Sequence, residues 1–211
     1  MLRKNAKTRL SAAERRQRLI DASIELFADY GYEASSVDDI ARRAGITKPV
    51  VYDHFSSKEA IFIAALELIR DGLLDRGAKV IAKETEPGGR LLAGIHAFFD
   101  FIEETPKSAR VLIMGSKGAP SIIEACQRVQ AQATSGIASL MKSSRPGSRS
   151  SNKNERALFL TAEFVKKGMH GLAEWWMDHP DVPRKEVEGV LAAVLKNGTA
   201  RAGEWHLPFT K

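Results

Sequence analysis

The amino-acid sequence predicts an all-α fold made of a small amino-terminal helical head and a larger helical body. Apolar side chains recur every three or four residues along most of the chain, which is the spacing of one face of a helix. Glycine and proline fall between these stretches, where helices begin and end. No stretch shows the strict alternation of apolar and polar residues that a half-buried strand requires. With 211 residues, 44% of them hydrophobic, the chain can bury a sizeable core.

Residues 36–58, SVDDIARRAGITKPVVYDHFSSK, predict two short helices around a tight turn. Ser36 is a suitable N-cap for the first helix, and Gly45 can adopt the left-handed conformation that the turn needs. Thr47 can cap the second helix, and Pro49 lies in its first turn, where a missing N–H is harmless. This spacing is that of a helix-turn-helix, whose second helix enters the major groove of DNA.

The remaining helices follow from amphipathic stripes and from their breakers. The helix before the helix-turn-helix ends at Gly31. A capping box formed by Ser56 and Glu59 precedes a long helix that runs to about Lys83, and the Pro-Gly-Gly at 87–89 predicts a turn. In the body we expect further helices over about 91–102, 106–114, 121–141, 154–179 and 183–200, with a serine-rich loop over 143–154.

The net charge of +6 is concentrated at the amino terminus. Residues 1–20 contain seven basic residues and one acidic residue, whereas the rest of the chain contains 25 of each. A basic segment directly before a helix-turn-helix suits contact with phosphates or with an adjacent minor groove; a solvated tail is the alternative. We therefore expect a basic flexible arm over residues 1–14, a helix-turn-helix domain over 15–60 and a helical domain over 61–211.

At these residues the chain resembles the TetR family, the tetracycline-repressor-like transcription regulators. The match runs from about Arg15 to Leu66 and includes LFADYGYEASSV, DIARRAGI and YDHFSSKEAIF. The carboxy-terminal GLAEWWMDHPDVPRKEVEGVLAAVL is similar to the end of the family's ligand-binding domain. The resemblance implies a homodimer that binds a palindromic double-stranded DNA operator and a small-molecule effector.

The predicted DNA contacts lie in and around the second helix. Lys48 lies at its start, where a lysine can donate to guanine O6 and N7, and Val50 can pack on a thymine methyl group. Other polar side chains suit phosphate oxygens and fix the register; the resemblance assigns Tyr52 and Lys58 to such contacts. The full DNA-binding set is Ser36, Thr47, Lys48, Val50, Tyr52, His54 and Lys58.

The resemblance also implies an effector pocket in the helical domain. The ring and sulfur side chains around this region suit an apolar or aromatic ligand, and His96 is the best polar residue to orient it. The predicted ligand-binding residues are His96, Phe99, Met114, Cys126 and Phe164. Plain core packing remains the alternative for each of them.

The last two predicted helices, at about 154–179 and 183–200, are the expected dimer interface. Small residues, Gly168, Gly171 and Ala173, lie among large ones in the first of them and permit close helix approach. An intramolecular core is the alternative explanation of the same pattern.

Other classes of function find little support in the sequence. Catalytic and phosphate-binding motifs are absent, so we expect no enzyme, and we expect no cofactor. His170, Glu174 and Asp178 share one helix face, but without a Cys/His cluster we assign no metal site. The single cysteine and the lack of a signal peptide or membrane span favour a cytoplasmic protein.

The sequence thus predicts a DNA-binding transcription regulator, in the first place a repressor that a ligand releases from DNA. Three alternatives remain open: a regulator that needs no ligand, an activator, and a helical protein–protein adaptor.

Overall fold

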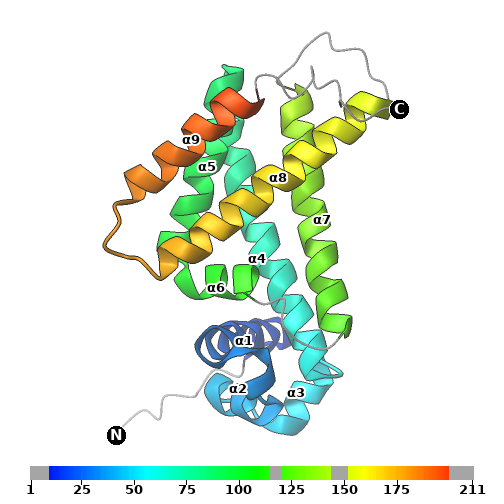
Figure 1. Cartoon of the computed structure of the whole chain (residues 1–211). Coiled ribbons are helices and arrows are strands. Elements are labelled where there is room, and N and C mark those ends of the chain that lie inside the picture. The colour runs from blue at the N-terminus through cyan, green and yellow to red at the C-terminus, as the bar shows by residue number, and fades with distance from the viewer. Residues whose placement is uncertain (1–9, 115–119, 144–151, 200–211) are drawn as a thin grey trace, which may run out of the picture.

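The computed structural model describes residues 10–114, 120–143 and 152–199. Within these ranges the chain is helical and contains no strand, which confirms the predicted all-α fold (Figure 1). The helices are α1 (Ala12–Ala34), α2 (Val37–Ala44), α3 (Lys48–His54), α4 (Lys58–Ile81), α5 (Pro87–Glu104), α6 (Pro106–Met114), α7 (Pro120–Ser143), α8 (Asn152–Met177) and α9 (Arg184–Thr199).

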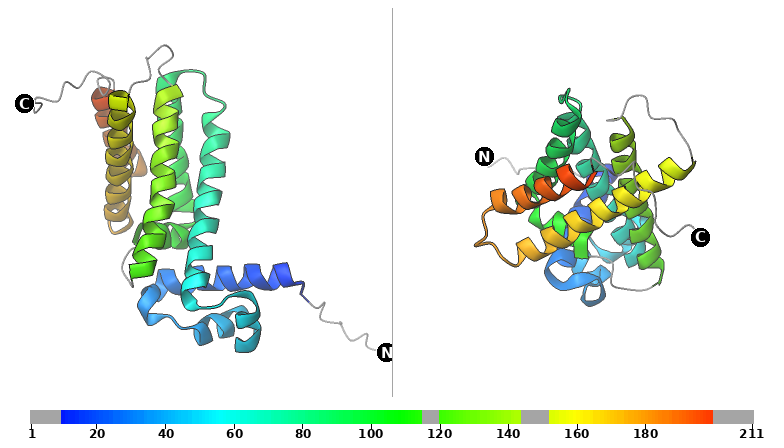
Figure 2. Two further views of the ribbon diagram at one scale, coloured as in Figure 1. Left: turned by 90° about the vertical axis from the view of Figure 1, so that its right-hand side faces the viewer. Right: turned by 45° about the horizontal axis from the view of Figure 1, so that its top comes forward.

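The helices form a head, an upright body and an outer layer. Helices α1, α2 and α3 make the head, and α4 runs from the head up into the body beside α5 and α7 (Figure 1). Helices α8 and α9 lie together on one side of this upright group (Figure 2). Because α4 belongs to both parts, a displacement of α4 in the body would also move the head.

The head closes around a small core to which each of its helices contributes. Leu19, Ile40 and Val51 are fully buried and belong to the same core cluster as Phe62, which lies in the first turns of α4. The Phe62 ring meets Phe27 edge to face, with 5.2 Å between ring centroids. Aromatic pairs in this arrangement add to the stabilisation that burial provides. The amino-terminal part of α4 is therefore an integral part of the head.

The body core lies between α5 and the helices that cover it. Phe99 is completely buried and meets Trp176 of α8 with 5.4 Å between ring centroids. The Trp176 indole N–H donates to the Val182 carbonyl at 2.9 Å, which ties α8 to the turn before α9. None of the helices in the described ranges is long and apolar enough to cross a bilayer.

Several predicted helix boundaries need correction. The predicted arm reaches too far, because α1 begins at Ala12 with a capping box of Ser11 and Glu14; residues 1–9 lie outside the described residues. The long helix is capped by Ser57 instead of Ser56, since the Ser57 hydroxyl accepts the Ala60 N–H at 3.1 Å. The domain boundary at 60/61 falls within this helix.

The predicted turn at Pro87 is wrong, because this proline begins α5. Proline fits the first turn of a helix as well as it fits a turn, so the residue type alone did not decide between them. The prediction of a break at Gly31 is confirmed: its φ of 80° and ψ of 168° interrupt the helical backbone before a last turn that ends at Ala34. The predicted serine-rich loop falls largely on residues 144–151, outside the described residues.

Candidate DNA-binding and effector sites

The turn between α2 and α3 has the predicted geometry. Gly45 adopts a left-handed conformation, with φ 66° and ψ 33°, at the end of α2. Its N–H donates to the Arg42 carbonyl at 3.2 Å, and the Ile46 N–H donates to the Ala41 carbonyl at 2.9 Å. These bonds satisfy the last carbonyls of α2 and turn the chain sharply into α3. A short α3 is thereby held out at the end of the head.

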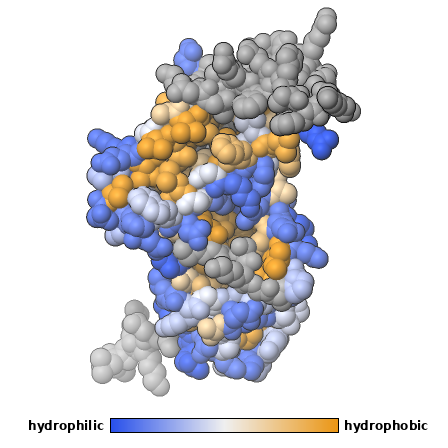
Figure 3. Space-filling model, in the orientation of Figure 1, coloured by the Kyte–Doolittle hydropathy of each residue, from blue (hydrophilic) through white to orange (hydrophobic). Residues whose placement is uncertain are grey.

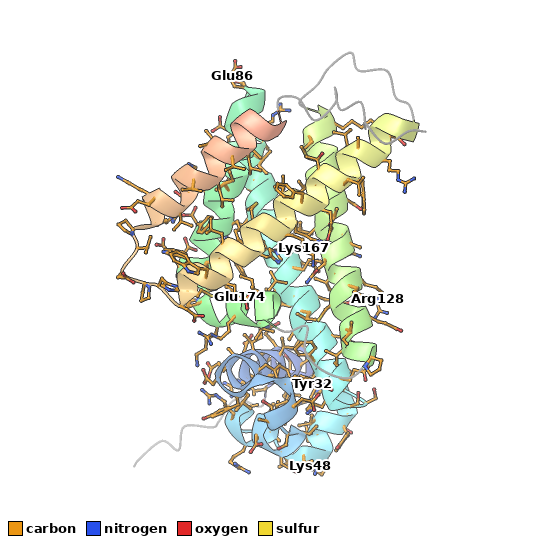
Figure 4. The ribbon with its side chains drawn as sticks, in the orientation of Figure 1. Tyr32, Lys48, Glu86, Arg128, Lys167 and Glu174 are labelled. Atoms are coloured by element: carbon orange, nitrogen blue, oxygen red, sulfur yellow. The ribbon has the colours of Figure 1, made fainter. Side chains whose placement is uncertain are left out.

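Lys48 lies on the exposed tip of the head, as Figure 4 shows. Its ammonium donates to Asp38 Oδ2 at 2.8 Å, and its side chain remains 47% exposed. This hydrogen bond and the carboxylate charge raise the Lys48 pKa above its ordinary value. The predicted base-reading lysine is therefore accessible and charged, and it is held by a carboxylate from the other helix of the motif.

Ser36 caps α2, as the sequence predicts. Its hydroxyl accepts the Asp39 N–H at 3.1 Å and donates to Asp39 Oδ2 at 2.5 Å. The serine hydrogen bond lowers the Asp39 pKa, and Arg42, which donates to the other carboxylate oxygen, adds to this effect. The Ser36 hydroxyl proton is thus engaged in the cap, and the predicted contact of this side chain with DNA stays a prediction.

Lys58 makes contacts within the head that the sequence analysis did not predict. Its ammonium donates to the Tyr32 carbonyl at 2.9 Å and to the Ser35 carbonyl at 3.0 Å. It also lies 4.1 Å from the centre of the Tyr32 ring, a cation–π arrangement. Lys58 thus joins the start of α4 to the end of α1 inside the head, a long-range contact that the local motif does not reveal.

The other predicted DNA contacts vary in exposure. Tyr52 is 50% exposed and Thr47 is exposed, whereas Val50 and His54 are half-buried. Thr47 occupies the N-cap position of α3, but within the described residues its hydroxyl makes no capping bond. Tyr52 and Thr47 therefore present polar groups beside Lys48.

A chain of ion pairs joins the helix-turn-helix to the body. Arg43 of α2 donates to Glu25 of α1 at 2.7 Å and lies 3.9 Å from Asp29. Asp29 in turn accepts from Lys107 of α6 at 3.0 Å. Each pair is partly exposed and weak by itself, but together the pairs give α6 an ionic link to the reading head.

The predicted effector residues do not all come together in one site. Phe99 and Cys126 are buried in the core, and burial raises the pKa of the Cys126 thiol. Phe164 is 67% exposed, so its assignment to a pocket is wrong. Helix α8 is apolar on two faces, and the spacing alone did not show which face points inward. The Met114 side chain lies outside the described residues.

His96 borders a cavity, but this cavity is not the predicted one. Its Nδ1 lies 3.0 Å from Glu188 Oε2, and the side chain is exposed on α5. The cavity, of about 210 Å³, lies between α5 and α9 and is open to solvent; its lining residues are Leu92, Ile95, His96, Lys185, Glu188, Gly189 and Ala192. Neither Phe99 nor Cys126 reaches it.

His170 is a partly buried polar residue that packs against the body core, which its helical spacing did not reveal. Its imidazole stacks on the Phe98 ring, with 5.6 Å between centroids and 2° between planes. Burial, helped by the charges of Lys166 and Lys167, lowers the His170 pKa to about 4, so the ring is neutral at pH 7. Within the described residues no group of side chains could hold a metal ion.

Lys166 is a second polar residue that helical spacing did not identify. Only 3% of its side chain is exposed, and its ammonium donates to Glu163 and to the Thr134 hydroxyl, each at 2.7 Å. A third donation, at 3.2 Å, reaches the Gln130 carbonyl. A buried ammonium is tolerated when its donors are satisfied in this way, and the network fastens α8 to α7.

Apolar side chains gather on the outer face of α8 and α9 (Figure 3). On α8 the exposed residues recur at three- and four-residue spacing: Leu160, Phe164, Gly168, Gly171 and Trp175. On α9 the apolar residues divide between two faces, because Val187 and Leu191 are buried while Val190 and Val194 are exposed. Ala173 is buried and belongs to the core instead of this face.

Known proteins resemble this chain in both parts. Residues 19–65 match the model described as bacterial regulatory proteins of the tetR family, and residues 87–196 match a tetracyclin repressor-like carboxy-terminal domain. The transcriptional activator FasR of Mycolicibacterium smegmatis is 32% identical over 205 residues, which cover 96% of this chain and 89% of FasR. The transcriptional repressor KstR2 of the same species is 36% identical over 101 residues, 48% of each protein.

Solved structures show the same fold. A tetR-family regulator from Streptomyces coelicolor has a TM-score of 0.69 and 28% identity, over 92% of this chain and 86% of its own. The fatty acid degradation regulator FadR of Bacillus halodurans, at 16% identity, has a TM-score of 0.71 over 92% and 96%. Together with the helix-turn-helix geometry, these matches establish that the chain belongs to the TetR family of DNA-binding transcription regulators.

Proposed function

We propose that this regulator binds a palindromic operator as a homodimer and releases it when a small apolar or aromatic effector binds the body. The proposal that the protein binds an operator is supported by the exposed tip of the head, where Lys48 is charged and accessible at the start of α3. Since the proposed partner is chromosomal DNA, we place the protein in the cytoplasm.

The DNA-binding mode follows from the side chains of this tip. Lys48 would donate to guanine in the major groove, and Val50 would pack on a thymine methyl group. Thr47, Tyr52 and His54 would bind phosphate oxygens and fix the register. Two such heads must lie about one DNA turn apart, roughly 34–36 Å, to enter successive major grooves.

The outer face of α8 and α9 is the proposed dimer interface. Leu160 and Phe164 are exposed there, and apart from the helix's own backbone no described heavy atom lies within 4 Å of a Cβ atom built at Gly168 or Gly171. Two glycines on an apolar face allow another helix to approach closely, and isologous contact of this face with its copy would bury it. A two-fold dimer is also what a palindromic operator requires.

The proposed effector site lies in the aromatic interior of the body, with Phe99 and Cys126 in its wall. His170 replaces His96 as the polar residue, because its neutral imidazole lies against Phe98 inside the body. A ligand that shifts α4 would alter the separation of the heads. A preference for the released state of a few kcal/mol, about 5.5 for a complete reversal, is enough to move the population.

Activation of transcription is a second candidate for the effect of this regulator. Ligand-released repression is the first proposal, and the relative KstR2 is named a repressor. Activation is favoured by FasR, which is named an activator and matches nearly the whole chain. A reporter gene behind the selected operator separates the two, because deletion of the regulator raises expression under repression and lowers it under activation.

Selection of bound fragments from random DNA tests the DNA part of the proposal. It should yield a palindrome with half-sites about one turn apart. Lys48→Ala should then cost about 1–3 kcal/mol at one base position of each half-site and relax the preference there. A uniform loss of affinity for every sequence would show that α3 does not dock as proposed.

A further inference from the structure

Asp38 accepts a hydrogen bond from the ammonium of Lys48 at the tip of the head. It lies in the first turn of α2, whereas Lys48 begins α3, so the two helices of the motif bring these side chains to one exposed tip. The neighbouring Asp39 is committed elsewhere, since one of its oxygens accepts from Ser36 and the other from Arg42. Asp38 takes no part in that cap.

The hydrogen bond between Asp38 and Lys48 leaves further donors and an acceptor of this pair unused. A lysine ammonium has three N–H donors, and a carboxylate has two acceptor oxygens. The bond between Nζ and Oδ2, at 2.8 Å, uses one donor and one oxygen. In the part of the chain that the structure describes, the other two donors and Oδ1 have no partner. The tip therefore offers two donors beside one acceptor.

A G·C base pair presents the complementary pattern in the major groove. Guanine offers the acceptors N7 and O6, and cytosine offers the N4 donor. O6 and N4 are hydrogen-bonded to each other across the base pair, about 2.9 Å apart, which matches the separation of Lys48 Nζ and Asp38 Oδ2. We propose that Asp38 and Lys48 together read a single G·C pair, with Lys48 donating to guanine and Asp38 accepting from cytosine N4.

Asp38 then determines the orientation of the base pair. In the inverted pair the guanine acceptors would face the carboxylate and the cytosine amino group would face the ammonium, so both contacts become unfavourable. A lysine without its carboxylate neighbour could swing on its flexible stem and follow guanine across the groove. This inference rests on the proposed docking of α3 in the major groove, and it adds a second specificity-determining residue to Lys48.

The test compares Asp38→Ala, Lys48→Ala and the double variant on the selected operator and on operators in which each base pair is replaced or inverted. Fluorescence anisotropy gives the affinities, and thermal melts show that each variant is folded. For the unaltered protein, inversion of one G·C pair in each half-site should weaken binding about tenfold or more. Asp38→Ala should reduce that penalty by about tenfold, at the same base pair where Lys48→Ala relaxes the guanine preference.

The double variant should lose no more of the inversion penalty than Lys48→Ala alone, because the two side chains act as one unit. Asp75→Ala is the matched control, since Asp75 forms a similar exposed pair with Lys79, 2.5 Å apart on α4, away from the head; it should leave the base ranking unchanged. The inference is overturned if Asp38→Ala changes the affinity for all sequences by one factor and keeps the inversion penalty. In that case a loss of affinity at one base position in Lys48→Ala would still support the proposed docking of α3. A uniform loss of affinity in Lys48→Ala would contradict both the docking and the joint reading of the G·C pair.

Discussion

The head and the outer side of the body differ in how far their large apolar side chains are buried. In the head, Leu19, Ile40, Val51 and Phe62 are buried, and the large exposed ring residues are tyrosines with a polar end. On α8 and α9, side chains as large as Phe164 stay in contact with solvent. The head buries its large apolar side chains within itself and presents polar groups to solvent, as a surface that binds DNA must. The body keeps an apolar face that only another apolar surface can cover.

Substitution of Phe164 gives the largest expected effect, because it tests the incomplete face directly. Phe164→Glu places a charge where the proposed interface is apolar, and two-fold symmetry repeats the change on both subunits. Burial of one Phe side chain contributes about 1.5–3 kcal/mol, so the dimer should lose about 3–6 kcal/mol. Light scattering should report a mass near the 23.2 kDa of the monomer, and operator binding should fall with it.

Phe99 supplies the matched comparison, since it is the same residue type in a buried position. Phe99→Ala should reduce the free energy of unfolding by about 3–5 kcal/mol, because it leaves a cavity in the body. Phe164→Ala should leave the unfolding of the isolated subunit nearly unchanged while it weakens the dimer. The distinction between the two regions fails if denaturant titrations at low protein concentration show equal losses for the two alanine variants.

The sequence predicts these two regions with unequal success for a physical reason. The turn of the head depends on residues a few positions apart, so Ser36, Gly45 and Pro49 are sufficient to predict it. The faces of α8 depend on which other helices lie against it, and a stripe that contains Phe164 looks the same whether it meets a core or a second subunit. For this reason the sequence predicts a pocket position for Phe164, and it does not reveal that His170 stacks on Phe98.

Lys58 shows that contacts distant in the sequence cannot be predicted from local spacing in the head either. Its phosphate contact is predicted from a local motif, whereas its observed acceptors, the carbonyls of Tyr32 and Ser35, come from more than 20 residues earlier. Local spacing cannot report such a contact. The long-range partners of Lys166 and Asp29 were missed for the same reason.

The pH dependence of stability should carry the signature of His170. Its pKa in the fold is about 4, below the ordinary 6.5. Protonation therefore favours the unfolded chain, so this contribution is fully present above pH 6.5 and is lost as the pH falls from 6.5 to 4. The loss should reach about 3 kcal/mol. Urea titrations at several pH values should show this loss for the unaltered protein and a smaller one for His170→Gln.

Removal of the Lys58 ammonium should destabilise the head without touching the DNA-reading tip. Lys58→Met keeps the apolar stem but leaves the Ser35 carbonyl without its lysine donor, at an expected cost of about 1–3 kcal/mol. Lys79→Met, at an exposed position on α4, is the control and should change stability little. Lys58→Met could instead leave the melting temperature unchanged, lower the affinity for DNA and reduce the salt dependence of binding. That result would support the phosphate contact that the family resemblance implies.

The smallest expected effect belongs to Tyr52, whose half-exposed ring lies beside Lys48 on the reading side. Tyr52→Phe removes one hydroxyl and leaves the ring, so the head should keep its stability. If the hydroxyl donates to a phosphate, binding should weaken by about 0.5–1.5 kcal/mol. The loss should be equal for the operator and for each of its single-base variants, because phosphate oxygens carry no sequence information. Anisotropy titrations against the same DNA panel used for Lys48→Ala provide the measurement. A loss confined to one base position would move Tyr52 from the anchoring side chains to the reading ones, and α3 would then have to lie deeper in the groove than the exposure of Lys48 suggests.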